Sequence, residues 1–334
     1  MPYRPWRYRH RTGMVAVLVG GALALAGCGG AAAGPGAAVG TAAATPSAGA
    51  GLHFAVITHG TAGDAFWSVV KNGAQAAGQK LGVAVDYRSD GDPGAQAKLI
   101  DNEVAQHVDG LVVSMANPDA LATSIQNAVH AGIPVITINS GEDRSAAFGA
   151  LTHVGQNEGI AGEQAGTRFK QAGRTKLLCV IHEAGNIGLN QRCDGAKRTF
   201  GDVTTVQVDV NNPTDAQARI RGSLQADPQI DAVLALNSQI AAGAVAAVHA
   251  ASSTAQVATF DLNSDVVNEI KAGDIAFAVD QQPYLQGYLP VVFLQLYKEN
   301  ADTVGGGRPV LTGPAFVDKS NVDTVAPYVA HGTR

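Results

Sequence analysis

The sequence predicts an α/β protein made of two similar lobes, each a doubly wound parallel sheet. Short apolar runs alternate with longer segments whose apolar residues recur at helical spacing. The second half of the chain repeats the pattern of the first. About 280 residues remain after the N-terminal segment is set aside, which exceeds the usual size of one hydrophobic core. Two lobes are therefore expected.

The alternation of strands and helices begins after residue 51. We expect strands at residues 54–58, 83–87, 110–114 and 133–138, and helices at 65–81, 93–107 and 118–131. Asp64 stands where a side-chain cap of the first helix belongs. Strands that are apolar on both faces and separated by helices indicate a parallel sheet covered on both sides.

An internal repeat relates the two lobes. The segment Asp109-Gly-Leu-Val-Val-Ser has a counterpart in Asp231-Ala-Val-Leu-Ala-Leu. The next strands end at Asn139 and Asp261, at nearly the same spacing from those segments. In sheets of this kind ligands bind beyond the carboxyl ends of the strands. Two lobes would therefore place two sets of strand-end residues around one cleft.

Residues 1–27 have the pattern of a signal peptide, with a basic start and an apolar run from Met14 to Ala26. That run is too short for a comfortable membrane span. It ends in Leu25-Ala26-Gly27-Cys28, which resembles the lipobox of bacterial lipoproteins and implies acylation of Cys28. An ordinary secretory signal with an incidental cysteine is the alternative. Both interpretations predict export.

Residues 28–51 are rich in Gly, Ala, Thr, Ser and Pro, a composition that predicts a flexible tether. The formal net charge of −5 offers no basic surface for nucleic acid. No Gly-x4-Gly-Lys phosphate loop is present, so ATP chemistry would belong to a separate subunit.

Cys179 and Cys193 are the two cysteines that remain once Cys28 is acylated. They form an even pair in an oxidising compartment, which favours a disulfide between a strand and the start of the following helix. Two separate thiols are the alternative, because Cys179 lies in an apolar run and could simply belong to the core.

Polar side chains gather at the predicted strand ends, together with the adjacent aromatic residues Phe66 and Trp67. Carboxylates and amides can bridge neighbouring hydroxyls of a sugar. An aromatic ring can cover the apolar C–H face of the same sugar. The combination suits a neutral polyol.

Several motifs occur in order along the chain: Asp64-Ala-Phe66-Trp67 with Lys71-Asn-Gly-Ala, Asp109-Gly-Leu-Val-Val-Ser, Gly132-Ile-Pro-Val-Ile-Thr, Gln191-Arg192-Cys-Asp-Gly195, Ala258-Thr-Phe-Asp261 and Gln281-Gln282-Pro283-Tyr-Leu-Gln-Gly. Together they resemble the type I periplasmic binding proteins that serve the import of ribose, other pentoses and hexoses. The resemblance runs from about Leu52 to about Val317. This resemblance implies a hinge of three crossings, with residues 52–155 and 282–310 in lobe 1 and residues 156–281 and 311–330 in lobe 2.

The resemblance also implies a ligand site. Carried over position by position, it includes Asp64, Phe66, Trp67, Asn139, Ser140, Asn190, Asn237, Asp261 and Gln281. Asn139-Ser140 replaces an Asp-Arg pair that the family often has. Asn190 takes the first position of the family's Arg-x-Arg-x-x-Gly pattern, so Asn190 is the expected contact and Arg192 is expected to be structural.

His182 is added because it follows a strand, although a surface hydrogen-bonding pair with Glu183 is the alternative. Core packing is the alternative role for Phe66 and Trp67, and a helix cap is the alternative for Asp261.

The implied function is that of a monomeric lipoprotein, anchored outside the cell, that closes around a monosaccharide or polyol. It would present this solute to an ABC permease with a separate ATPase, without a cofactor or a metal. A binding protein or sensor for an autoinducer-like furanosyl compound or a nucleoside is the alternative. An exported enzyme is a remote alternative, because neither Gly-x-Ser-x-Gly nor His-Glu-x-x-His occurs.

Overall fold

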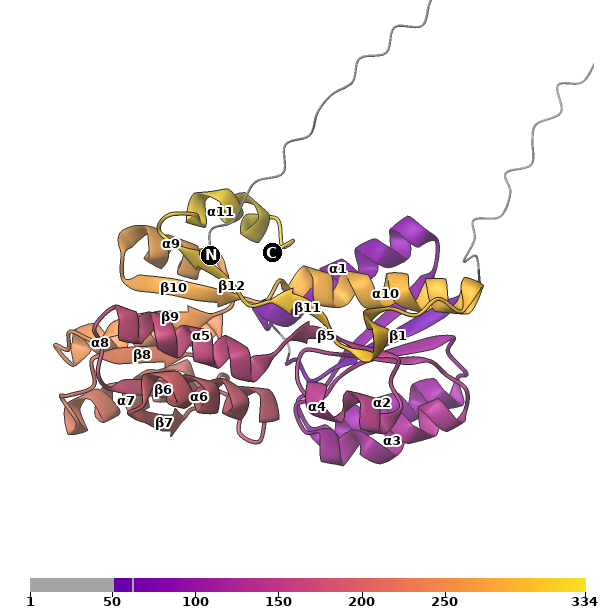
Figure 1. Ribbon diagram of the computed structural model, residues 1–334, viewed down its shortest axis with the longest axis horizontal. Coiled ribbons are helices and arrows are strands. Elements are labelled where there is room, and N and C mark those ends of the chain that lie inside the picture. The colour runs from indigo at the N-terminus through magenta and orange to yellow at the C-terminus, as the bar shows by residue number, and fades with distance from the viewer. Residues whose placement is uncertain (1–50, 62) are drawn as a thin grey trace, which may run out of the picture. The chain divides into compact units, whose positions relative to one another are not determined.

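The computed structural model describes residues 51–61 and 63–334, which form two six-stranded sheets flanked by helices (Figure 1). The predicted signal peptide, the lipidation site at Cys28 and nearly all of the tether lie outside the described residues. Within the described ranges, no helix is both long and apolar enough to span a bilayer.

The first sheet has the strand order β11-β5-β4-β3-β1-β2, and its strands run parallel. The strands are β1 (His53–Thr58), β2 (Ala84–Ser89), β3 (Gly110–Ser114), β4 (Val135–Ile138), β5 (Thr152–Gln156) and β11 (Val310–Gly313). The helices in this part of the chain are α1 (Ala65–Leu81), α2 (Pro93–Ala105), α3 (Pro118–His130), α4 (Glu142–Ser145) and α10 (Pro283–Asn300).

Residues of β1 alternate between two cores. Phe54 and Val56 pack in the cluster that contains residues of α1 and α10, whereas Ala55 and Ile57 pack in the cluster that contains residues of α2 and α3. A strand that is buried on both faces reads as a continuous apolar run, which is the signal that predicted this sheet.

The second sheet has the order β12-β10-β9-β8-β6-β7, parallel except for β12, which runs antiparallel to β10. Its strands are β6 (Leu177–Ile181), β7 (Val203–Gln207), β8 (Ala232–Ala235), β9 (Gln256–Phe260), β10 (Ile275–Asp280) and β12 (Ala315–Asp318). The helices are α5 (Glu158–Gln171), α6 (Ile187–Phe200), α7 (Pro213–Ala226), α8 (Ser238–Ala250), α9 (Ser264–Ala272) and α11 (Val322–Ala330).

The two sheets repeat one topology, because β2-β1-β3-β4-β5 and β7-β6-β8-β9-β10 have the same order. The predicted fold class is confirmed. The chain passes from one sheet to the other after β5, after β10 and between β11 and β12. Residues 311–313 pair with β5 in the first sheet, although the sequence had placed them in lobe 2.

Glycines let two pairs of helices approach closely, α1 with α10 and α5 with α6. A Cβ atom on Gly287 of α10 would lie 1.9 Å from the carbonyl oxygen of Val70 on α1. A Cβ atom on Gly195 of α6 would lie 2.1 Å from the carbonyl oxygen of Gly159 on α5. Each lobe therefore carries a helix pair whose spacing depends on a missing side chain. Figure 1 shows α1 and α10 side by side.

Candidate ligand-binding site

A cavity of about 510 Å³ lies at the carboxyl ends of strands from both sheets. Its lining comes from the residues after β1, β2 and β4 of the first sheet and after β6, β7, β8, β9 and β10 of the second. This is the position where ligands bind in sheets of this topology. The volume is in the range of sites for small molecules.

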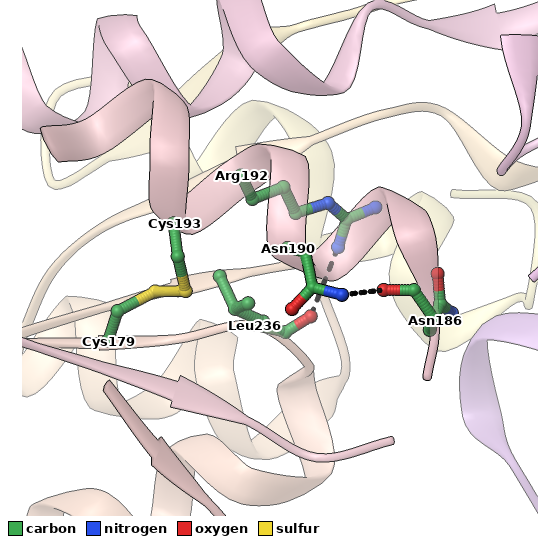
Figure 2. The surroundings of a disulfide bond; sticks show 6 residues. All are labelled: Cys179, Asn186, Asn190, Arg192, Cys193 and Leu236. Atoms are coloured by element: carbon green, nitrogen blue, oxygen red, sulfur yellow. Dashed lines mark hydrogen bonds between the residues drawn. A yellow bond between two sulfur atoms is a disulfide. The ribbon is translucent and has the colours of Figure 1, made fainter. Parts of the chain in front are cut away.

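All of the predicted site residues except Asn190 line this cavity. They are Asp64, Phe66, Trp67, Asn139, Ser140, His182, Asn237, Asp261 and Gln281. Asn190 is exposed on α6, and its Nδ2 atom donates a hydrogen bond to the backbone oxygen of Asn186 at 3.1 Å (Figure 2). Arg192, which the sequence assigned a structural role, lines the cavity.

Asp64, Phe66 and Trp67 begin α1. The Asp64 carboxylate accepts a hydrogen bond from the backbone nitrogen of Trp67 at 3.2 Å and so caps the helix. The rings of Phe66 and Trp67 meet edge to face with their centroids 5.0 Å apart. Both rings also belong to the core of the first sheet, so packing and cavity lining are combined in the same side chains.

Asn139, Gln281 and Asp261 form a hydrogen-bonded chain across the cavity wall. Asn139 Nδ2 donates to Gln281 Oε1 at 3.1 Å, and Gln281 Nε2 donates to Asp261 Oδ1 at 2.7 Å. Asn139 and Asp261 have positive φ values of 62° and 67°, a conformation that is uncommon outside glycine. They follow β4 and β9, the equivalent strands of the repeat, so the same strained turn occurs in both lobes.

The Asp261 carboxylate is buried and only partly satisfied. Burial raises its pKa to about 7, against the opposing effects of Arg192 and of the hydrogen bond from Gln281. Among the described residues, no side chain or backbone group donates a hydrogen bond to Asp261 Oδ2. Oδ2 is therefore available to accept a hydrogen bond from a ligand.

Arg192 joins α6 to two neighbouring elements. Its Nε and Nη2 atoms donate to the two carboxylate oxygens of Glu158 at 2.6 and 3.0 Å, and both side chains are buried. Its Nη1 atom donates to the backbone oxygen of Leu236 at 3.1 Å, as Figure 2 shows. The guanidinium also lies over the ring of Phe260, 4.3 Å from its centroid. The Arg192 side chain therefore lines the cavity and also joins the elements that form its wall.

Asn237 and His182 complete the second lobe's contribution to the predicted set. Asn237 Oδ1 accepts a hydrogen bond from the backbone nitrogen of Gln239 at 2.7 Å and caps α8. Burial, with smaller effects from the charges of Arg192 and His59, lowers the pKa of His182 to about 3. His182 is therefore neutral near pH 7. Its buried Nδ1 atom has no hydrogen-bond partner among the described residues.

His59, Glu183 and Asn186 also line the cavity, although the sequence did not select them. Asn186 Nδ2 donates to Glu183 Oε2 at 2.8 Å and lies 3.4 Å from His59 Nε2. The Ser140 hydroxyl donates to Asn186 Oδ1 at 3.1 Å. These contacts connect the end of β1 and the end of β4 with the start of α6. The sequence contained a signal for these three residues, because each of them follows a predicted strand or caps a helix.

Cys179 and Cys193 form a disulfide that connects β6 to α6 (Figure 2). Asn186 caps α6, and Arg192 precedes Cys193 on that helix. The bridge therefore holds against its own strand the helix that, with its cap, supplies the cavity residues Asn186, Leu189 and Arg192.

Two repeated sheets with a polar cavity at their strand ends define a solute-binding protein of the type I periplasmic class. The chain belongs to the family described as the periplasmic binding protein domain, which residues 54–301 match. The predicted family is confirmed.

Relatives with assigned ligands are similar over most of the described chain. A ribose import binding protein from Haemophilus influenzae is 29% identical over 237 residues, covering 68% of this chain and 79% of the relative. A xylose/arabinose-binding protein from Sulfolobus acidocaldarius is 27% identical over 244 residues, covering 68% of this chain and 60% of that protein. The chain thus spans less than two thirds of the second relative's length.

A solved structure is closer in sequence. It is that of a carbohydrate transporter from Acidothermus cellulolyticus 11B in complex with myo-inositol. It is 44% identical, with a TM-score of 0.83, and the match covers 85% of this chain and 99% of that one. These relatives are named as binding or transport proteins rather than as enzymes.

Proposed function

We propose that this protein binds a monosaccharide or a cyclic polyol in the cavity and delivers it to an ABC permease that works with a separate ATPase. The observation that carries the proposal is the buried, half-satisfied carboxylate of Asp261 in a cavity that also contains amides and the aromatic pair Phe66 and Trp67. Adjacent ligand hydroxyls would complete the hydrogen bonding of the carboxylate and the amides. Similarity to a myo-inositol complex favours a cyclic polyol.

Ligand capture would couple to movement of the lobes about the three chain crossings. The hydrogen bond from Ser140 to Asn186 joins a loop of the first sheet to the start of α6 in the second. In the proposed cycle, opening breaks this contact and ligand release follows. A bound polyol would favour the closed arrangement, because it would contact both sets of strand ends.

A panel of sugars, polyols and nucleosides in a thermal-shift assay tests the proposal. A ligand that binds only the folded protein raises its melting temperature. We expect myo-inositol or a related polyol to produce the largest shift. A response confined to nucleosides would instead support a nucleoside-binding role, and turnover of any compound would indicate an enzyme.

The proposal includes export and a lipid anchor at Cys28, which lies outside the described residues. Several acyl chains hold a protein firmly on a membrane, whereas one chain binds only marginally. Cys28→Ala should therefore convert a membrane-associated protein into a released or unprocessed one. Cell fractionation followed by intact-mass measurement would show this. Unchanged membrane association of Cys28→Ala would contradict the lipoprotein assignment.

A further inference from the structure

The charges that line the cavity are unbalanced. Six carboxylate side chains line it, and Arg192 is the one lysine or arginine among the described lining residues. The carboxylates belong to Asp64, Asp90, Asp92, Glu183, Asp209 and Asp261. Asp92 and Asp209 are exposed, so water and salt screen them. Asp64 and Asp261 are buried and are screened far less.

Arg192 offsets only part of this excess, because its guanidinium is already paired with both carboxylate oxygens of Glu158. Glu158 lies outside the lining, so the ion pair is electrically balanced without any cavity carboxylate. Nor do the histidines help, because burial lowers the pKa values of His59 and His182.

Two pairs of cavity carboxylates repel each other, Glu183 with Asp64 and Asp64 with Asp261. Burial raises the pKa of Asp64, and the charge of Glu183 adds to that increase. Burial likewise raises the pKa of Asp261, and the charge of Asp64 adds to it. Asp64 comes from the first lobe, whereas Glu183 and Asp261 come from the second. The two lobes therefore bring like charges toward each other around the ligand space.

We propose that the cavity selects its solute by charge, taking amino-substituted polyols such as amino sugars or aminocyclitols in their protonated form and rejecting sugar acids and sugar phosphates. This inference rests on the proposed function and names its solute class. An ammonium group carries three hydrogen-bond donors and a positive charge. It can therefore satisfy the free oxygen of Asp261 and offset the repulsion among the three carboxylates. A carboxylate or phosphate on the solute would add to that repulsion.

Three glucose derivatives that differ at one position test the charge preference: glucose, 6-amino-6-deoxyglucose and glucuronate. Calorimetric titration in dilute buffer at pH 8, where Asp261 is mostly ionised, should show the amine binding at least fivefold more tightly than glucose, and glucuronate at least tenfold more weakly. Both differences should shrink only in part in 0.5 M salt, because salt screens the exposed carboxylates of Asp92 and Asp209 far more than the buried ones of Asp64 and Asp261. Myo-inositol and an amino-deoxyinositol form a second matched pair with the amine at another place on the ring.

Equal affinity for the three glucose derivatives, or tighter binding of glucuronate than of glucose, would overturn the inference. An amine that binds no more tightly than its neutral parent in both pairs would overturn it as well. These outcomes do not affect the proposed function. The proposed function is contradicted if no compound of the sugar and polyol panel binds.

A variant that removes one negative charge from the cavity tests whether the cavity causes the preference for amines. Glu183→Gln removes one negative charge and keeps the size of the side chain, so it should reduce the amine-to-neutral affinity ratio at least threefold. Asp101→Asn is the matched control, because Asp101 is exposed on α2 and does not line the cavity. The ratio should be unchanged in Asp101→Asn. An equal reduction in both variants would mean that the net charge of the protein, not the cavity, sets the preference, and would overturn the inference.

Discussion

At the scale of single residues, Asp261 is the cavity side chain best placed to accept hydrogen bonds from a ligand. It follows β9 with a left-handed backbone conformation, one of its oxygens is bound by Gln281, and it is 4% exposed. A buried carboxylate with one free oxygen is costly unless it is neutral or finds a partner. The free protein therefore contains a group that a ligand with several donors would stabilise.

The pH dependence of stability tests this description of Asp261. Its pKa is about 7 in the folded protein and about 3.9 in an unfolded chain. Between these values the folded state retains a proton that the unfolded state has lost, so this group makes the free energy of unfolding fall as pH rises from about 4 to 7. Asp261→Asn lacks this dependence. The free energy of unfolding of Asp261→Asn, minus that of the wild type, should therefore increase between about pH 4 and pH 7.

Urea unfolding of both proteins at pH 5 and pH 8, without ligand, measures this difference. The buried side chains of His153 and His182, whose pKa values burial lowers to about 4 and about 3, give the opposite slope. They are present in both proteins, so the comparison removes their contribution. A constant difference between the two proteins at both pH values would contradict a raised pKa of Asp261.

Strand-end position predicted most of the cavity residues, because the carboxyl ends of parallel strands converge. Strand-end position could not predict whether Asn190 or Arg192 faces the cavity. Both residues lie on the same helix, and their angular positions around the helix axis decide which side chain points toward the ligand space. His59 and Asn186 lay in the predicted segments but carried no distinguishing pattern. Their role in the lining depends on contacts between the lobes, such as the 3.4 Å approach of His59 Nε2 to Asn186 Nδ2.

At the scale of elements, the close contact of α10 with α1 depends on Gly287. Gly287→Ala would force its new methyl group against the carbonyl oxygen of Val70, 1.9 Å away. Overpacking of this kind costs about 1–3 kcal/mol, so the free energy of unfolding should fall by that amount. Gly222→Ala is the matched control, because Gly222 lies within α7 with no atom within 4 Å of an added Cβ. It should stabilise the protein by up to about 1 kcal/mol.

Urea unfolding of both variants distinguishes close packing from helix propensity. Equal stabilisation of the protein by Gly287→Ala and Gly222→Ala would contradict the helix contact.

The disulfide between β6 and α6 has an element-scale effect that can be measured. Its two cysteines are separated by 14 residues, and closing a loop of that length stabilises a fold by about 3 kcal/mol. Cys179→Ala, Cys193→Ala and the double variant should each lose about this amount, because each removes the same bridge without placing a hydroxyl in the core that surrounds both cysteines. Mass spectrometry of the exported protein without reduction should show two fewer hydrogens than the reduced form. Two free thiols in trapped material would refute the bridge.

Element prediction was most successful where pattern and cap agreed, as in α1, where Asp64 caps a helix that spans the predicted residues 65–81. It was wrong at residues 311–313. The neighbouring segments Val310–Gly313 and Ala315–Asp318 have similar apolar character and are separated only by Pro314. Each pairs with a different sheet, and nothing local in the sequence specifies the partner strand.

At the scale of the whole described chain, the repeat explains why one cavity has two sets of ligand-facing residues. Asn139 and Asp261 directly follow the equivalent strands β4 and β9, and Gln281 connects these two side chains by hydrogen bonds. The sequence predicted this repeat because matched segments recur at near-constant spacing. The identity of the solute could not be predicted in the same way, since it depends on the balance of charges that both lobes contribute.

Calorimetric titration of the best ligand into the wild type, Asp261→Ala and Asp101→Asn tests whether the cavity around Asp261 is the solute site. Loss of a buried carboxylate that accepts ligand hydrogen bonds should cost about 3 kcal/mol, or roughly a hundredfold in affinity. Asp101→Asn should bind as the wild type does. Circular dichroism would establish an equal folded fraction in the three proteins. A hundredfold loss confined to Asp261→Ala is the predicted result, and an affinity of Asp261→Ala within threefold of the wild type would contradict the assignment of this cavity as the solute site.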